Sequence, residues 1–174
     1  EKMTVTVAIL GRPNVGKSTL FNRLIGQKIA LVDDQPGVTR DRRLGAGKLG
    51  DLEFDVFDTA GLDDAKKGSL EARMSLQAEE AARLADHIFF VIDARAGVTP
   101  IDEKFAERIR KLGKPVTVLA NKAETKLIQQ TVPEAFSLGF GEPHAISGEH
   151  GEGIEAIYEV VKPLVVADLK ANPV

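Results

Sequence analysis

Short apolar runs alternate along this chain with longer segments whose apolar residues recur at helical spacing. The short runs are rich in β-branched residues, which predicts buried strands. They cover residues 4–10, 52–58, 87–94 and 115–121; the segment 43–59 holds one more strand ahead of residue 52, and a short last strand is expected at 142–147. Because most of these runs are almost unbroken, we expect strands that are covered on both faces.

Helical periodicity fills the intervals between these runs. It predicts helices at 17–26, 69–85, 101–112 and 153–169, and a short helix that begins at Pro133. In the third helix four apolar residues share one stripe, and we expect all of them to face the core: Ile101, Phe105, Ile109 and Leu112. Residues 30–43 are polar and rich in turn formers, which predicts a loop.

This order of elements predicts an α/β fold. We expect a mostly parallel, six-stranded sheet with helices on both faces, in three layers α/β/α. Ligands of such sheets bind beyond the carboxyl ends of the strands. At 174 residues the chain has the length of one domain with a substantial core, so we expect a single domain over residues 1–174.

Composition narrows the functional classes. The net charge of −3, from 23 basic and 26 acidic residues, is not that of a dedicated nucleic-acid binder. The absence of cysteine excludes disulfides and thiol nucleophiles. The longest apolar run, around residues 88–92, is too short to cross a bilayer, and the first residues lack a signal-peptide pattern. We therefore expect a cytoplasmic protein with no membrane contact and no sequence-specific contact with nucleic acid.

The stretch "GRPNVGKS" at 11–18 lies between a predicted strand and a predicted helix. Its glycines let backbone amides turn toward anionic oxygens, and the helix start adds its dipole. We expect Lys17 to reach the β- and γ-phosphates of a nucleotide and Ser18 to bind Mg²⁺. The remaining phosphate contacts are expected from the neighbouring loop positions: Asn14, Val15, Gly16 and Thr19.

Two further stretches suit a γ-phosphate sensor. Asp58 ends a strand and is a candidate to hold the metal, while Gly61 is able to present its amide to the γ-phosphate. Thr39, in the polar loop, is a candidate to complete the Mg²⁺ shell when the γ-phosphate is present. An ordinary turn is the alternative interpretation of the stretch that begins at Asp58.

The stretch "NKAE" at 121–124 follows a buried strand and suits recognition of guanine. We expect the Asn121 amide to read the carbonyl edge of the base, Glu124 to accept from its N–H groups, and Lys122 to brace the phosphate loop. After the last strand, backbone amides near Ser147 and Gly148 are expected at the guanine oxygen.

In order, the stretches "GRPNVGKSTLFNRL", "PGVTRDR", "DTAGL", "NKAE" and "LGFGEPHAISGEHGEGI" resemble the translation-factor-like P-loop GTPase family. They look most like the first of two tandem GTPase domains in bacterial ribosome-assembly GTPases. The resemblance implies a P-loop NTPase fold, GTP/GDP and Mg²⁺ as ligands, hydrolysis of GTP, and a monomeric domain excised from a longer protein. It further implies a switch that acts on the large ribosomal subunit or its assembly intermediates.

The chain departs from the family pattern at two positions and raises a question about catalysis at a third. Glu124 stands where the family commonly has Asp, and Gly148 stands where Ala usually follows the serine. Leu62, next to Gly61, cannot orient a water as the glutamine of Ras-like GTPases does. In similar GTPases with a hydrophobic residue there, an asparagine at the place of Asn14 helps hold K⁺ against the phosphates, so we expect Asn14 to bind K⁺ and to take part in catalysis with Lys17, Thr39 and Gly61.

Two other functional classes stay open at this point. The first is a docking module that binds a nucleotide but hydrolyses it negligibly, which Leu62 makes plausible. The second is an ATP-dependent phosphotransferase that uses the same phosphate loop, against which "NKAE" argues. Affinity for guanine over adenine nucleotides and a single-turnover hydrolysis rate distinguish the three classes.

Overall fold

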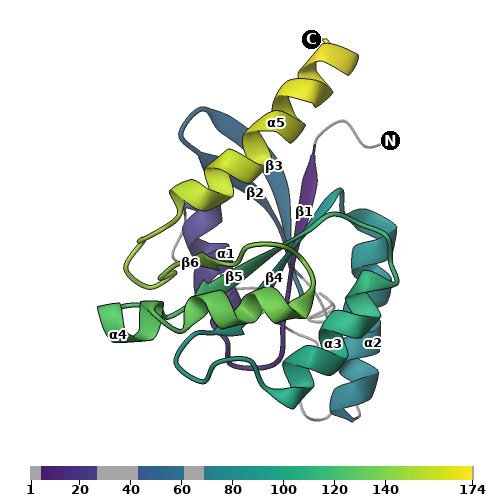
Figure 1. Cartoon of the computed structure of the whole chain (residues 1–174). Helices are drawn as coiled ribbons and strands as arrows, with labels where there is room; N and C mark the ends of the chain where they lie inside the picture. The colour runs from purple at the N-terminus through teal and green to yellow at the C-terminus, as the bar shows by residue number, and fades with distance from the viewer. Residues whose placement is uncertain (1–4, 27–42, 61–68, 174) are drawn as a thin grey trace, which may run out of the picture.

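The computed structural model describes residues 5–26, 43–60 and 69–173 (Figure 1). At its centre is one six-stranded sheet with the strand order β2-β3-β1-β4-β5-β6. All neighbouring strands are parallel except β2 and β3, which form an antiparallel hairpin. The strands are β1 (Thr6–Leu10), β2 (Arg43–Leu49), β3 (Leu52–Asp58), β4 (His87–Asp93), β5 (Val116–Asn121) and β6 (His144–Ala145).

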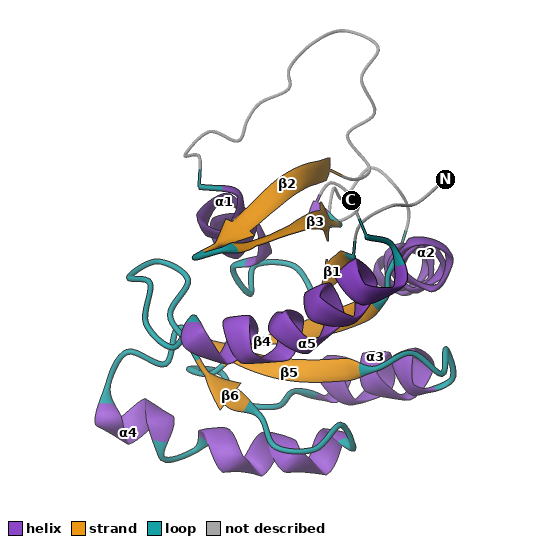
Figure 2. Ribbon diagram, turned by 90° about the horizontal axis from the view of Figure 1, so that it is seen from above, coloured by secondary structure: helices purple, strands orange, loops and turns teal. Residues whose placement is uncertain are grey.

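Helices cover both faces of this sheet, as Figures 1 and 2 show. Apolar residues of α1 and α5 pack with one face of the strands, and those of α2, α3 and η3 pack with the other. The predicted three-layer α/β/α fold is therefore confirmed. The helices are α1 (Lys17–Ile25), α2 (Leu70–Leu84), α3 (Pro100–Arg110), α4 (Lys126–Gln129) and α5 (Glu155–Ala171), with the 3₁₀ helix η3 at Val132–Leu138.

Local sequence determines where these helices begin and end. Ser69 starts α2 by accepting a hydrogen bond from the backbone of Ala72. Thr99 and Asp102 cap α3 reciprocally, each side chain bonding the backbone of the other residue. Gly26 ends α1 at a φ of 71°, a left-handed conformation that favours glycine. The predicted helices therefore begin and end within two residues of the observed α1, α2, α3 and α5.

Three details differ from the sequence-based expectations. Ile101 is 37% exposed and lines a surface groove beside Leu70 and Met74, because the first turn of α3 lies against α2 rather than over the sheet. The last strand is only two residues long, His144–Ala145, although the next residue still donates its amide to the Ala120 carbonyl of β5 at 2.9 Å. The helix expected from Pro133 is η3, a 3₁₀ helix that begins at Val132.

The β2–β3 hairpin is fastened to the body of the protein at its tip. The Tyr158 hydroxyl on α5 donates to the Asp51 carboxylate at 2.8 Å, next to the hairpin turn. At the other end of the hairpin the backbone of Arg43 lies opposite Asp58. Among the strands that the structure describes, β2 lies at the edge of the sheet and pairs with β3 alone.

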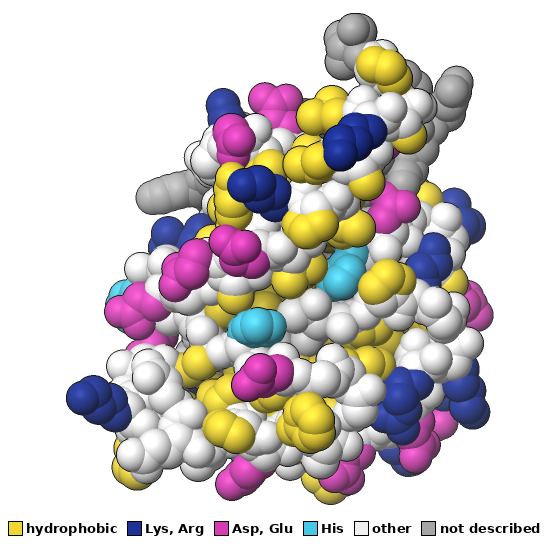
Figure 3. Space-filling model, turned by 45° about the horizontal axis from the view of Figure 1, so that its top comes forward, with side chains coloured by type: hydrophobic (Ala, Val, Ile, Leu, Met, Phe, Trp, Pro, Cys, Tyr) yellow, Lys and Arg dark blue, Asp and Glu magenta, His cyan; other side chains and the backbone are white. Residues whose placement is uncertain are grey.

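The far end of α5 extends past the sheet (Figure 1), and apolar side chains there remain on the surface (Figure 3). Val166 is 39% exposed and Leu169 is 52% exposed. Within the described part of the chain no helix combines the length and the apolar character that crossing a membrane requires.

Candidate functional site

Most of the sequence-predicted site residues that the structure describes gather where β1, β3, β4 and β5 end. Two adjoining cavities lie there, and both are bordered by Gly16 and Thr19. The first has a volume of about 310 Å³ and is lined also by Asn14, Lys17, Ser18 and Ala60. The second has a volume of about 220 Å³ and is lined also by Arg95, Asn121, Lys122, Glu124 and Glu149. The expected phosphate-binding residues and the expected base-reading residues thus form two halves of one groove.

The loop between β1 and α1 depends on residues with unusual backbone conformations. Gly16 has a φ of 99°, and a Cβ at this position would lie 2.2 Å from the Asn121 side-chain nitrogen. Asn14 also has a positive φ, of 67°. Asparagine tolerates this region better than most residues do. Glycine is therefore required at position 16 both for backbone conformation and for the close approach of β5.

Lys17 is the first residue of α1 and only 3% exposed. Its ammonium group donates to the carbonyl oxygens of Gly11 at 2.8 Å and Arg12 at 2.9 Å. A buried ammonium needs such acceptors to offset its lost hydration. The ammonium group is therefore held against the backbone of the loop, and Lys17 lines the first cavity together with Ser18.

Side chains from α2, from the residue after β3 and from α3 hold this loop and the end of β1 from outside. Gln77 on α2 is 1% exposed, and its side-chain oxygen accepts from the Gly11 amide at 3.2 Å. The Thr59 hydroxyl donates to the Ile9 carbonyl at 3.1 Å. The Arg12 guanidinium lies 3.4 Å from the buried Asp102 carboxylate at the start of α3. The sequence analysis did not single out these supports, although Gln77 interrupts the apolar stripe of α2 and so carried a signal.

Asp58 is completely buried at the end of β3, where its backbone pairs with Ile9. One carboxylate oxygen accepts from the Ala60 amide at 3.1 Å. A carboxylate and the hydroxyl of Ser18 are hard oxygen donors of the kind that Mg²⁺ prefers, so the residues at this position fit the expected metal. Three predicted participants lie outside the described residues: Thr39, Gly61 and Leu62.

Asn121 joins the two halves of the groove. Its side-chain nitrogen donates to the Val15 carbonyl at 2.9 Å, and its side-chain oxygen accepts from the Gly148 amide at 2.8 Å. The Ser147 amide donates to the Glu152 carbonyl at 2.9 Å. The amides of Ser147 and Gly148, expected at the guanine oxygen, thus donate to partners within the protein, because the loop closes on itself and on Asn121.

Lys122 braces the phosphate loop, as the sequence suggested. It has a φ of 70°, and its ammonium group donates to the Asn14 carbonyl at 2.9 Å and to the Asp93 carboxylate at 3.3 Å. Burial alone would raise the pKa of Asp93, but hydrogen bonds from Arg95 and the charge of Lys122 together lower this pKa below its ordinary value. Asp93 therefore stays ionised and anchors Lys122, a role that the sequence analysis missed.

Glu124 lies at the open end of the second cavity. One of its carboxylate oxygens accepts from the Ser147 hydroxyl at 2.9 Å, and the His150 ring nitrogen lies 3.7 Å from the same oxygen. The hydrogen bond bends the side chain toward the loop that follows β6. A carboxylate one methylene longer than Asp is thereby held beside the cavity that Asn121 and Lys122 line.

Comparison with known proteins gives a consistent result. Residues 6–122 match the profile of a protein family described as "50S ribosome-binding GTPase". The chain is 61% identical over 163 residues to GTPase Der of Bradyrhizobium sp. strain BTAi1 and 57% identical over 170 residues to GTPase Der of Jannaschia sp. strain CCS1. These alignments cover 94% and 98% of this chain but 36% of each relative, so the chain spans about a third of their length.

Solved structures of Era GTPases share the fold. A crystal structure of Era in complex with MgGDPNP and nucleotides 1506–1542 of 16S ribosomal RNA is 34% identical, with a TM-score of 0.73 over 92% of this chain and 56% of that one. A single-residue variant of Aquifex aeolicus Era bound to GDP and AlF4⁻ is 32% identical, with a TM-score of 0.72 over 91% of this chain and 56% of that one.

Proposed function

The chain belongs to the family of 50S ribosome-binding GTPases, and we propose from this membership that it binds GTP and GDP with Mg²⁺ and hydrolyses GTP to GDP and phosphate. The observation that carries the proposal is the pair of hydrogen bonds made by Asn121. They tie the loop that would hold phosphates to the loop beside the cavity that would hold the base. A nucleotide that fills both cavities would therefore bind to one connected site.

On the phosphate side, the chain is proposed to bind the phosphates and to neutralise their negative charge. The loop from Gly11 to Ser18, with the additional contact of Thr19, would surround the diphosphate, and the Lys17 ammonium would move from loop carbonyls to phosphate oxygens. Ser18, Asp58 and Thr39 would hold Mg²⁺, which supplies a positive charge against the β- and γ-phosphates. Gly61 would present its amide to the γ-phosphate.

On the base side, the proposed ligand is guanine. Asn121 keeps one side-chain N–H beyond the one given to Val15, and this N–H is suited to the carbonyl edge of the base. Glu124 is suited to accept from the ring N–H and the exocyclic amine. Lys122 would flank the base while bracing Asn14. Adenine presents the reverse pattern of donors and acceptors, which disfavours the ATP-dependent phosphotransferase.

For the hydrolytic step, we propose that K⁺ takes the place of a catalytic side chain. Asn14 lies on the wall of the first cavity beside Lys17 and Ser18, and its side chain is exposed there. An amide oxygen at this position is a suitable ligand for a monovalent cation. Positioning and neutralisation of charge carry most of the catalysis in phosphoryl transfer, so a cation near the phosphates would suffice without a glutamine at Leu62.

The wider role follows from the relatives. We propose that the chain is one GTPase domain of a longer cytoplasmic protein and that it acts as a monomeric switch on the large ribosomal subunit or its assembly intermediates. The support is membership of the family of 50S ribosome-binding GTPases and the 61% identity to a protein named GTPase Der.

A nucleotide titration tests the proposal. Wild-type protein and Lys17→Ala should be titrated with GDP, XDP and ADP in Mg²⁺ buffer, and single-turnover hydrolysis of GTP should be followed in parallel. We expect GDP to bind at least about a hundredfold more tightly than ADP, because each mismatched donor or acceptor leaves a buried group unpaired. Tighter binding of ADP would reject the guanine site, and tight GDP binding without hydrolysis would instead identify a docking module.

A further inference from the structure

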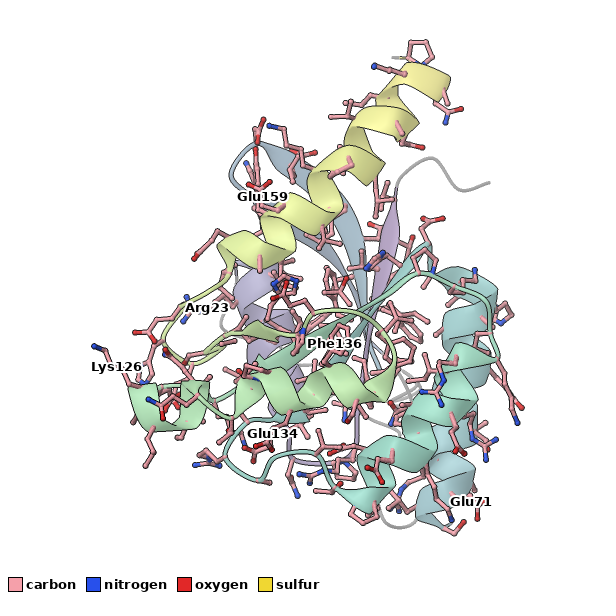
Figure 4. The ribbon with its side chains drawn as sticks, viewed as in Figure 1. Arg23, Glu71, Lys126, Glu134, Phe136 and Glu159 are labelled. Carbon is pink, nitrogen blue, oxygen red and sulfur yellow. The ribbon has the colours of Figure 1, made fainter. Side chains whose placement is uncertain are left out.

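Arg23 lies on α1, away from both cavities, and reaches the loop between β6 and α5 (Figure 4). Its Nε donates to the Gly148 carbonyl at 2.6 Å, and its Nη2 donates to the Glu149 carbonyl at 2.8 Å. Hydrogen bonds from a charged donor to two adjacent carbonyls define the orientation of a backbone segment more strictly than one neutral bond does. Arg23, which lines neither cavity, thus holds this loop in place.

The shape of the loop is adapted to this guanidinium group. Gly151 has a φ of 74°, and a Cβ there would lie 2.7 Å from Arg23 Nη1. The amides of Gly151 and Glu152 both donate to the Ser147 carbonyl, at 2.8 and 3.1 Å. The loop therefore forms a closed turn, and the Arg23 side chain packs against its bend.

The same loop borders the proposed guanine site. Gly148 is held from two sides, its amide by the Asn121 side chain at 2.8 Å and its carbonyl by Arg23. The next residue, Glu149, lines the second cavity. Any displacement of Gly148 would consequently move Asn121, the residue that joins this cavity to the phosphate loop.

Because residue 148 is glycine, this part of the loop needs another residue to restrict its backbone. Its φ lies outside the left-handed region, and an added Cβ would meet Leu20 and Asn121 only at an ordinary contact distance of 3.5 Å. Sterics therefore do not demand glycine at this position. Glycine has the largest backbone freedom of any residue, so without an external constraint this part of the loop would sample more conformations than alanine would allow.

We propose that Arg23 is a positioning residue for base recognition: by holding the carbonyls of Gly148 and Glu149 it keeps Asn121 in its base-reading orientation and slows the release of guanine nucleotides. The proposal rests on the proposed function. The proposal gives α1, the helix that begins at the phosphate loop, a second role at the base. The hydrogen bond from Arg23 also compensates for the conformational freedom of Gly148.

The test compares Arg23→Ala with Arg110→Ala. Arg110 is a matched control because its Nη1 donates to the Leu138 carbonyl at 2.5 Å and packs on Gly139, yet it lines neither cavity. GDP release is measured with a fluorescent GDP analogue. Hydrogen–deuterium exchange of the Gly151 and Glu152 amides is measured on the protein without nucleotide. We expect Arg23→Ala to release GDP about tenfold faster and to exchange both amides faster, while Arg110→Ala stays within about twofold of wild type.

Two further variants make the test specific. Arg23→Lys is expected to release GDP at an intermediate rate, because an ammonium group lacks the fork that reaches both carbonyls. Adding Gly148→Ala to Arg23→Ala should slow release again by restricting the loop. Equal release rates for wild type and Arg23→Ala, or equal acceleration by Arg110→Ala, would overturn the role of Arg23. If wild-type protein itself does not retain GDP, the proposed function fails instead.

Discussion

The side-chain nitrogen of Asn121 lies 2.9 Å from the carbonyl oxygen of Val15, a residue 106 positions earlier in the chain. This hydrogen bond crosses from the end of β5 to the phosphate loop, and it is buried. A neighbouring bond from Gly148 occupies the oxygen of the same side chain. Asn121 is therefore a structural connection as well as a candidate base contact, and its removal affects both halves of the groove.

Replacement of Asn121 by alanine should weaken both folding and binding. The Val15 carbonyl and the Gly148 amide would lose a buried partner, which we expect to lower the free energy of unfolding by about 2 kcal/mol. GDP affinity should fall by about a hundredfold, since a base contact is lost as well. Chemical denaturation and GDP titration measure the two effects. Asn172→Ala, at the exposed end of α5, is the control and should change neither.

Gly16→Ala and Gly26→Ala separate backbone strain from steric overlap. Both glycines have a positive φ, but a Cβ at Gly26 meets nothing within 4 Å, whereas at Gly16 it would lie 2.2 Å from Asn121. We expect Gly26→Ala to cost about 1 kcal/mol of stability through its backbone conformation alone. Gly16→Ala should cost clearly more and abolish GDP binding, as measured by denaturation and titration. Similar losses in the two variants would contradict the close approach of Asn121.

Glu124 should determine the preference for guanine over hypoxanthine. IDP differs from GDP by lacking the exocyclic amine that Glu124 is proposed to accept from. Wild-type protein should therefore bind GDP about tenfold or more tightly than IDP, and Glu124→Ala should bind the two alike. Competition titrations with both nucleotides give the ratio. Glu134→Ala, on the exposed side of η3 (Figure 4), serves as the control, and a ratio unchanged by Glu124→Ala would remove the residue from the base site.

Potassium should accelerate hydrolysis if Asn14 binds it. At equal ionic strength we expect single-turnover hydrolysis of GTP to be at least about tenfold faster in K⁺ than in Na⁺. Asn14→Ala should reduce this difference, and its GDP affinity is measured beside the rates because alanine tolerates the positive φ of 67° at this position poorly. Equal rates of the wild-type protein in the two salts would exclude a role for K⁺.

Stability should fall in mildly acidic solution because of His87. Burial lowers the pKa of His87 from 6.5 to about 4, and its ring lies 2.8 Å from the Thr117 hydroxyl. Between these pH values the unfolded chain binds a proton that the folded protein does not, so the free energy of unfolding decreases as the pH falls from 6.5 toward 4. The loss attributable to this group approaches about 3 kcal/mol.

The check on His87 is a series of denaturation curves from pH 7.5 to 4.5. His87→Gln, which has no ionisable ring, should show a smaller decrease over this interval, although it will be less stable at pH 7.5 because the packing with Phe89 is lost. His144→Gln provides a comparison at a second histidine. An identical pH dependence of wild type and His87→Gln would show that carboxylates account for the decrease.

The sequence predicted the fold because its two periodicities agree with the element order. Near-continuous apolar runs became the central strands, and stripes such as Phe105 and Ile109 became buried helix faces. Ile101 shares that stripe but is partly exposed, because periodicity identifies a face and not how far the neighbouring element extends over it. The motif residues Lys17, Asp58 and Asn121 come together because Asp58 and Asn121 end the parallel strands β3 and β5, and Lys17 follows the parallel strand β1.

The supports of the site were less predictable. Asp93 and Arg23 have no spacing that distinguishes them from residues of ordinary strands and helices, and Gln77 is marked only as a polar residue within the apolar stripe of α2. Their roles arise from contacts across the sheet or across a loop, such as the 66 positions between Gly11 and Gln77. Such a partner becomes visible only in the three-dimensional arrangement. A polar residue within an apolar stripe does, however, indicate that a buried hydrogen-bond partner exists.

The turn of the β2–β3 hairpin is tied to the body of the protein, and this affects how the edge of the sheet can open. Among the described strands β2 pairs with β3 alone, and a hydrogen bond between Tyr158 and Asp51 connects the turn to α5. A separation of β2 from β3 that begins at Arg43 would first expose the backbone of Asp58, which lies opposite, while the bond at the turn still holds the other end of the hairpin.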